Sequence, residues 1–229
     1  MGYLQQLADR ESFVVDYFRN RVLPSFQRFD TAEFEDVLLQ KRALSAHFKA
    51  MYLVVIRTIG RGSIVKIAGE ILRDEYIPQD HTLLLDNDLR RMGFSNERLV
   101  GTVASPQTLE VIAGAYMEAA RSNVLSVHQA VFLRTFAELL SGIEYMGIVP
   151  ELERRYGLTA KDSEFYFPHM LHDRSAGVLS TTATTHTDGF NAVLADLLTS
   201  PHRLTTAQVS MQEALRLREN FWKQFSRSK

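Results

Sequence analysis

Apolar residues recur along this chain at helical spacing, three or four positions apart, and alternating strand patterns of useful length are absent. This periodicity predicts an all-α fold. The 229 residues can bury a full hydrophobic core, and no low-complexity linker or internal repeat divides them. We therefore expect residues 1–229 to form a single all-helical domain of eight to ten helices.

Helix-capping residues mark where several of these helices begin and end. Residues 30–60 start with Asp30 as N-cap and Glu33 at the third helical position, which is a capping-box pattern, and they end at Gly60. Residues 105–122 open with Ser105 as N-cap, followed by a proline at the first helical position.

Two later stretches also carry helix signals. Residues 123–149 are apolar on much of the helix circumference, which is typical of a central buried helix, and we expect this helix to stop before Pro150. Thr159 is predicted to cap the next helix. The amphipathic C-terminal residues 205–229 are expected to pack against the core.

Composition excludes several classes of function. The chain has no cysteine, so disulfides, zinc–thiolate sites, iron–sulfur clusters and cysteine nucleophiles are excluded. A formal net charge of −1 gives no reason to expect a nucleic-acid partner. The longest apolar run, "MYLVVI", is too short to span a bilayer, and the N-terminus lacks the apolar core of a signal peptide. We expect a cytoplasmic protein without a membrane partner.

The stretch "EFYFPHMLHDRSAG" places two metal-ligating residue types on one helix face. His169 and Asp173 are four residues apart, so their side chains lie one turn apart on the same face. One turn further along stands Ala176, which has no ligating atom. His172 lies at the edge of the same face, and His186 follows later in the chain; either is a substitute ligand.

Other acidic and imidazole side chains lie on segments predicted to be central. Glu144 sits inside an apolar helix, where a carboxylate needs a cation, a metal ion or a hydrogen-bond donor. Asp74, Glu75 and His81 fall close together, with a helix-breaking Pro78 between the acidic pair and the histidine. Carboxylates and imidazoles on facing helices are typical of iron or manganese sites, although an arginine partner would equally satisfy Glu144.

Three stretches, in this order, resemble the haem-oxygenase-like di-metal oxidase superfamily, which is related to the TenA and pyrroloquinoline-quinone synthesis protein C folds. They are "DEYIPQDHTLLLDNDLRRMGF", "GIEYMGIVPELERRYGL" and "EFYFPHMLHDRSAG", and the resemblance covers about residues 40–195. It implies an up-and-down helical bundle around a central cavity with a non-haem Fe(II) centre of one or two ions, Mn being an alternative. The residues that fall on the family's ligand positions are Asp74 or Glu75, His81, Glu144 as a bridge, His169 and Asp173.

The resemblance implies an O₂-dependent oxidase or oxygenase that acts on a small substrate in the bundle cavity. Tyr145 is the candidate catalytic, redox-active residue, with core packing as its other interpretation. The missing ligand at Ala176 favours an alternative, a metal-free ligand-binding or cofactor-less protein on the same fold. A protein acting only through its outer helices is a third class. The fold class also accommodates a homodimer.

Overall fold

The computed structural model describes residues 2–172 and 186–225, and within these ranges every regular element is a helix. The prediction of an all-α fold is therefore confirmed. The elements are α1 (Tyr3–Phe26), α2 (Thr31–Ser45), α3 (Phe48–Ile59), α4 (Ser63–Asp74), α5 (His81–Arg91), α6 (Asn96–Gly101), α7 (Pro106–Ala119), α8 (Ser126–Leu133), the π-helical segment η1 (Arg134–Leu139), α9 (Leu140–Tyr156), α10 (Tyr166–His172), α11 (His186–Leu197) and α12 (Pro201–Lys223).

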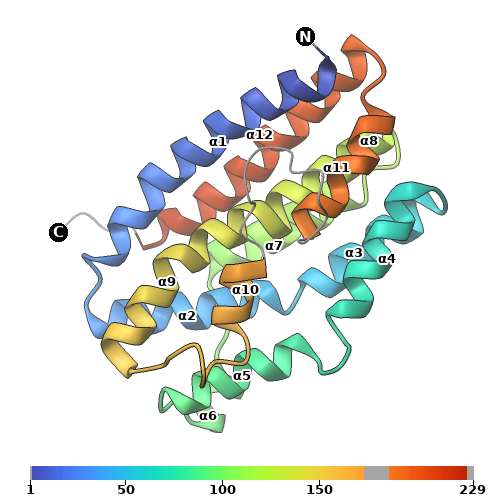
Figure 1. Cartoon of the computed structure of the whole chain (residues 1–229). Coiled ribbons are helices and arrows are strands. Elements are labelled where there is room, and N and C mark those ends of the chain that lie inside the picture. The colour runs from blue at the N-terminus through green and yellow to red at the C-terminus, as the bar shows by residue number, and fades with distance from the viewer. Residues whose placement is uncertain (1, 173–185, 226–229) are drawn as a thin grey trace.

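Long helices form the body of the bundle, and short helices cover one side of it. Helix α1 packs against both α9 and α12, while α12 also packs against α7 and α8 (Figure 1). The short helix α10 lies against α9, and α11 contacts α4, α8 and η1. None of the helices in the described part of the chain combines the length and hydropathy needed to cross a bilayer.

The core is built mainly from large apolar side chains that several helices contribute. Phe18, Phe34, Phe132, Phe136 and Phe221 are each fully buried. Burial of one such side chain stabilises the fold by about 1.5–3 kcal/mol. These contacts join the elements on which the polar site is built.

Several helix ends lie where the capping residues predict them. Asp30 and Glu33 form the capping box of α2, and Ser105 accepts a hydrogen bond from the amide of Thr108. Gly60 ends α3 with φ of 76°, a left-handed conformation that glycine adopts at low cost. The expected C-terminal amphipathic helix is α12, which packs against the core as predicted.

Three expectations about helix boundaries are wrong. The helix expected over residues 30–60 is divided into α2 and α3 at Ala46, although no proline or glycine marks the break. Pro150 lies inside α9 rather than after it. A proline there cannot donate a hydrogen bond to the backbone carbonyl four residues earlier, and because Pro150 is exposed, water can solvate that carbonyl instead. Thr159 belongs to a turn in which its hydroxyl bonds Asp162, and the following helix starts only at Tyr166.

Glu144 forms part of a buried ion network that connects three helices. Its carboxylate accepts hydrogen bonds from Lys41 Nζ of α2, from Arg218 Nη1 of α12 at 3.1 Å, and from Trp222 Nε1 at 2.8 Å. Burial lowers the pKa of Arg218, and the adjacent Glu144 carboxylate opposes that shift. The expectation that Glu144 bridges metal ions is therefore corrected: its oxygens are bound by the cations and the donor that a buried carboxylate requires.

Removing one cation from this network should destabilise the fold strongly. We expect Arg218→Met to lower the free energy of unfolding by about 3–5 kcal/mol, because it leaves a buried charge incompletely compensated. Urea denaturation followed by circular dichroism measures the change. Arg216→Met, which removes an exposed pair with Glu213 on the same helix, should cost less than about 1 kcal/mol. If both variants lose the same free energy of unfolding, the buried network contributes no more to stability than an exposed ion pair.

Candidate metal centre

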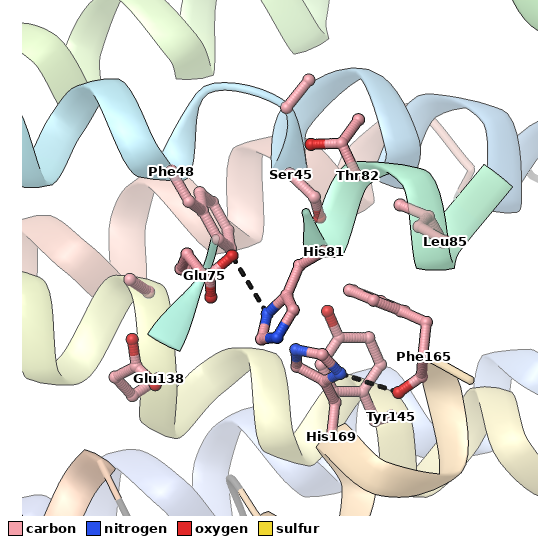
Figure 2. A pocket seen from close by; sticks show the side chains of 12 residues that line it. Ser45, Phe48, Glu75, His81, Thr82, Leu85, Glu138, Tyr145, Phe165 and His169 are labelled. Carbon is pink, nitrogen blue, oxygen red and sulfur yellow. Dashed lines mark hydrogen bonds and ion pairs between the residues drawn. The ribbon is translucent and has the colours of Figure 1, made fainter. Parts of the chain in front are cut away.

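Three side chains from three separate elements bring ligand atoms together. Glu75, His81 and His169 each offer one atom, and these atoms all lie within 4.8 Å of one another. Glu75 immediately follows α4, His81 is the first residue of α5, and His169 lies in α10. Figure 2 shows the two imidazole rings facing each other, with the Glu75 carboxylate beside His81.

The connection between α4 and α5 places two of these ligands by local interactions. Pro78 lies in the break between the helices, as predicted, and the amide of His81 donates to the carbonyl oxygen of Glu75 at 3.0 Å. Asp80 caps α5 by accepting from the amide of Thr82 at 2.8 Å. His81 Nδ1 then lies 3.2 Å from Glu75 Oε2.

A hydrogen bond to the backbone sets the tautomer of His169. Its Nδ1 lies 2.7 Å from the carbonyl oxygen of Phe165, so a neutral ring donates its proton there and carries the lone pair on Nε2. The Phe165 ring stacks on the same imidazole with centroids 3.9 Å apart. Metal-binding histidines are typically oriented in this way, by a carbonyl or carboxylate on the second nitrogen.

The buried carboxylate of Asp88 holds the N-terminal end of α10. It accepts hydrogen bonds from the hydroxyl of Ser163 at 2.6 Å and from the amides of residues 164–166 at 2.8–3.1 Å. The amides of residues 164 and 165 precede α10 and that of Tyr166 lies in its first turn, so none of them has an acceptor within the helix. Asp88 lies on α5, seven residues after His81, and therefore on the same face. One helix thus supplies one ligand and anchors the helix that supplies another.

These ligands line a pocket with an empty volume of about 450 Å³, which includes the solvent at its mouth. Tyr145, the expected catalytic residue, lines the pocket beside His169, with ring centroids 5.9 Å apart. The other lining residues are Ser45, Ala46, Phe48, Thr82, Leu85, Ala137, Glu138 and Phe165.

Glu138 is the pocket carboxylate that sequence reasoning missed. It belongs to the π-helical segment η1, and it accepts a hydrogen bond from the Tyr52 hydroxyl and contacts His186. Glu138 and Glu144 are six residues apart on one apolar stretch. Expected burial therefore does not show which of the two carboxylates belongs to the site. The π turn changes which positions share a face, and such segments frequently lie at functional sites.

The remaining predicted ligands lie elsewhere or outside the described residues. Glu75, rather than Asp74, joins the two histidines; Asp74 is half exposed and lies near His186. Asp173 and Ala176 fall outside the described residues. His172 is the last residue of α10 that the structure describes, and its side chain is likewise not described.

The residues present fit a non-haem iron ion. Two imidazoles and one carboxylate are the donor combination of non-haem Fe(II) oxygenases. The tautomer of His169 leaves the correct nitrogen for ligation, and the three ligand atoms are close enough to bind one ion with small shifts. The observed geometry therefore defines a candidate site for a divalent transition metal.

Solved structures with the same fold cover almost the whole chain. One from Shewanella denitrificans, a domain of unknown function with a haem oxygenase-like fold, has 17% identity over 97% of this chain and 93% of its own, with a TM-score of 0.73. A CADD-like protein of unknown function from Nostoc punctiforme has 13% identity over 96% and 97%, with a TM-score of 0.75. A TenA homolog from Pseudomonas syringae has 9% identity over 96% and 93%, with a TM-score of 0.68.

The fold is thus a haem oxygenase-like helical bundle, as the sequence resemblance predicts. Residues 35–219 match the family of iron-containing redox enzymes, and the chain belongs to that family. No curated protein matches it.

Loss of the Asp88 carboxylate should loosen α10. We expect Asp88→Ala to lower the free energy of unfolding by about 2–4 kcal/mol, because buried donors lose a charged acceptor. Hydrogen exchange at the amides of residues 164–166 should accelerate, as mass spectrometry can measure. Asp162→Ala, an exposed change in the preceding turn, should alter stability by less than about 1 kcal/mol. Unchanged exchange in Asp88→Ala would show that α10 is held by other contacts.

Proposed function

We propose that this protein is a non-haem iron oxidase or oxygenase that uses O₂ to oxidise a small molecule in the pocket. Glu75, His81 and His169 hold Fe(II), with Mn(II) as an alternative ion. One observation carries the proposal: ligand atoms of the type and number that non-haem iron requires lie within 4.8 Å of one another. Membership of the iron-containing redox family supports it.

Each ligand is held in position by the chain before any ion arrives. The Phe165 carbonyl orients His169, and the Glu75 carboxylate lies against His81, so little reorganisation precedes binding. An iron(II) ion held by these residues would supply the redox chemistry with O₂ that the side chains themselves lack. The side chains of Phe48, Leu85 and Phe165 give part of the pocket wall an apolar surface.

Polar side chains around the pocket give the site its means of orienting a substrate and of moving protons. Ser45 and Thr82 offer hydroxyl groups for hydrogen bonds. Tyr145 is the tyrosine among the described residues that line the pocket, and we propose that its phenol donates a proton to the bound substrate.

A substrate carboxylate would find its cation in the bound metal ion rather than in a basic side chain. No lysine or arginine is among the described residues that line the pocket. Arg57 and Lys66 are exposed, and Arg134 pairs with Glu11 in the core, where burial lowers the pKa of Arg134 to about 10.

Metal binding should stabilise the protein measurably. Fe(II) supplied without oxygen at about 100 times its Kd should add about 2.7 kcal/mol and raise the melting temperature by roughly 5–10 °C. His81→Ala and His169→Ala should lose most of this shift, which differential scanning fluorimetry measures. His202→Ala, an exposed histidine of α12, is the matched control and should keep it.

Two results would contradict the proposal. If Fe(II) leaves the wild-type melting temperature unchanged, the pocket belongs to a metal-free protein. If His169→Ala shows the full shift, the ion binds elsewhere. If the proposal is correct, the iron-loaded wild type should consume O₂ faster than iron-loaded His169→Ala. An oxygen electrode measures both rates.

A further inference from the structure

A groove on the outer surface reaches the buried ion network of Glu144. It lies between the C-terminal ends of α1 and α12, and its empty volume of about 700 Å³ includes the adjoining solvent. The single tryptophan of the chain, Trp222, lines this groove, and 5% of its surface is exposed. The other lining residues are Arg21, Val22, Arg28, Glu219 and Lys223.

The N–H group of the Trp222 indole meets a buried carboxylate. Its Nε1 donates a hydrogen bond to Oε1 of Glu144 at 2.8 Å. The other oxygen of that carboxylate, Oε2, accepts from Lys41 and Arg218. A hydrogen bond from an N–H group to a carboxylate is charge-assisted, and it gives the indole proton an acceptor inside the protein.

Tyr145 connects the same network to the candidate metal pocket. It directly follows Glu144 on α9, and its ring lies beside His169 at the wall of the pocket, as Figure 2 shows. Lys41 Nζ lies 5.3 Å from the centre of the Tyr145 ring. Lys41 and Glu144 thus join the phenol that lines the pocket to the indole that lines the groove.

Tyrosine and tryptophan are the side chains that give up a single electron most readily in a chain without cysteine. Loss of the electron makes the phenol or indole proton strongly acidic, so oxidation needs a proton acceptor nearby. Trp222 has Glu144 as its acceptor, and Tyr145 lines a pocket that opens to solvent. Tyr166 lies 6.1 Å from Tyr145 between ring centroids, but its buried hydroxyl has no hydrogen-bond partner within the described residues. Trp222 rather than Tyr166 is therefore the expected electron donor to an oxidised Tyr145.

We infer that Tyr145 and Trp222 form a relay that carries an oxidising equivalent from the pocket to the surface groove when O₂ reacts at the site without substrate. The inference rests on the proposed function, since an iron site oxidised by O₂ is the one-electron oxidant. The relay removes that oxidising equivalent from the neighbourhood of the ligands His81 and His169, which it would otherwise damage.

Electrons and protons balance at each step of the relay. Tyr145 first loses one electron to the oxidised site and its phenolic proton to water in the pocket. Trp222 then returns one electron to the tyrosyl radical, which becomes a phenolate, and the Nε1 proton of Trp222 passes to Glu144. The phenolate lies beside the Lys41 cation and regains a proton from pocket water. The indole radical at the groove is repaired when a reductant in solution donates one electron and Glu144 returns the proton.

The test locates the radical with a spin trap. Iron-loaded protein is exposed to O₂ without substrate in the presence of tert-nitrosobutane, whose nitrogen forms a covalent bond with a carbon-centred radical. Tandem mass spectrometry locates the adduct, which is counted per O₂ consumed. We expect the adduct on Trp222 in the wild type, little of it there in Tyr145→Phe, and the wild-type amount in the matched control Tyr166→Phe. Trp222→Phe should shift the adduct to Tyr145, because the second step is then blocked.

Each outcome separates this inference from the proposed function. If the iron-loaded wild type consumes no O₂, both fail. If it consumes O₂ but Trp222 carries no adduct, or carries as much in Tyr145→Phe as in the wild type, the relay is wrong and the proposed function stands. An adduct on the exposed Tyr76 in place of Trp222 would indicate a diffusing oxidant and would also overturn the relay. Helix content by circular dichroism must match the wild type for each variant; if Trp222→Phe fails this check, Tyr145→Phe decides the matter.

Discussion

The geometry of the candidate centre depends on the buried carboxylate of Asp88. The described part of helix α10 spans Tyr166–His172, and its start is held by contacts from α5. Asp88 binds the free amides at its start, and the packing of α10 on α9 supplies the rest. Because Asp88 and His81 share one face of α5, the same contact that stabilises α10 also brings His169 next to His81.

Two glutamates on one buried stretch serve different purposes for electrostatic reasons. Glu144 is surrounded by Lys41, Arg218 and Trp222, so its charge is compensated within the protein and it joins three helices. Glu138 accepts a hydrogen bond from the Tyr52 hydroxyl, contacts the His186 imidazole and lines the pocket. Glu138 and Glu144 are six residues apart, which places them about 120° apart around a helix and therefore on different faces.

Much of the fold and part of the site could be predicted from local patterns. Capping residues such as Asp30 and Ser105 predicted helix starts because a side chain and a nearby amide interact within one turn. The break at Pro78 and the helical setting of His169 were likewise readable. The sequence could not show whether Glu138 or Glu144 lines the pocket. Both lie in an apolar run, and only their partners, which are distant in the sequence, distinguish them.

The sequence by itself determined the all-α class, the family resemblance and the histidines at 81 and 169, because helical periodicity and short-range spacing are properties of the linear chain. Only the tertiary structure decided that Glu75, and not Asp74, lies beside those histidines. It also decided that His186 contacts Glu138. Those contacts join residues far apart in the chain. Their geometry follows from how helices pack, which local spacing does not encode.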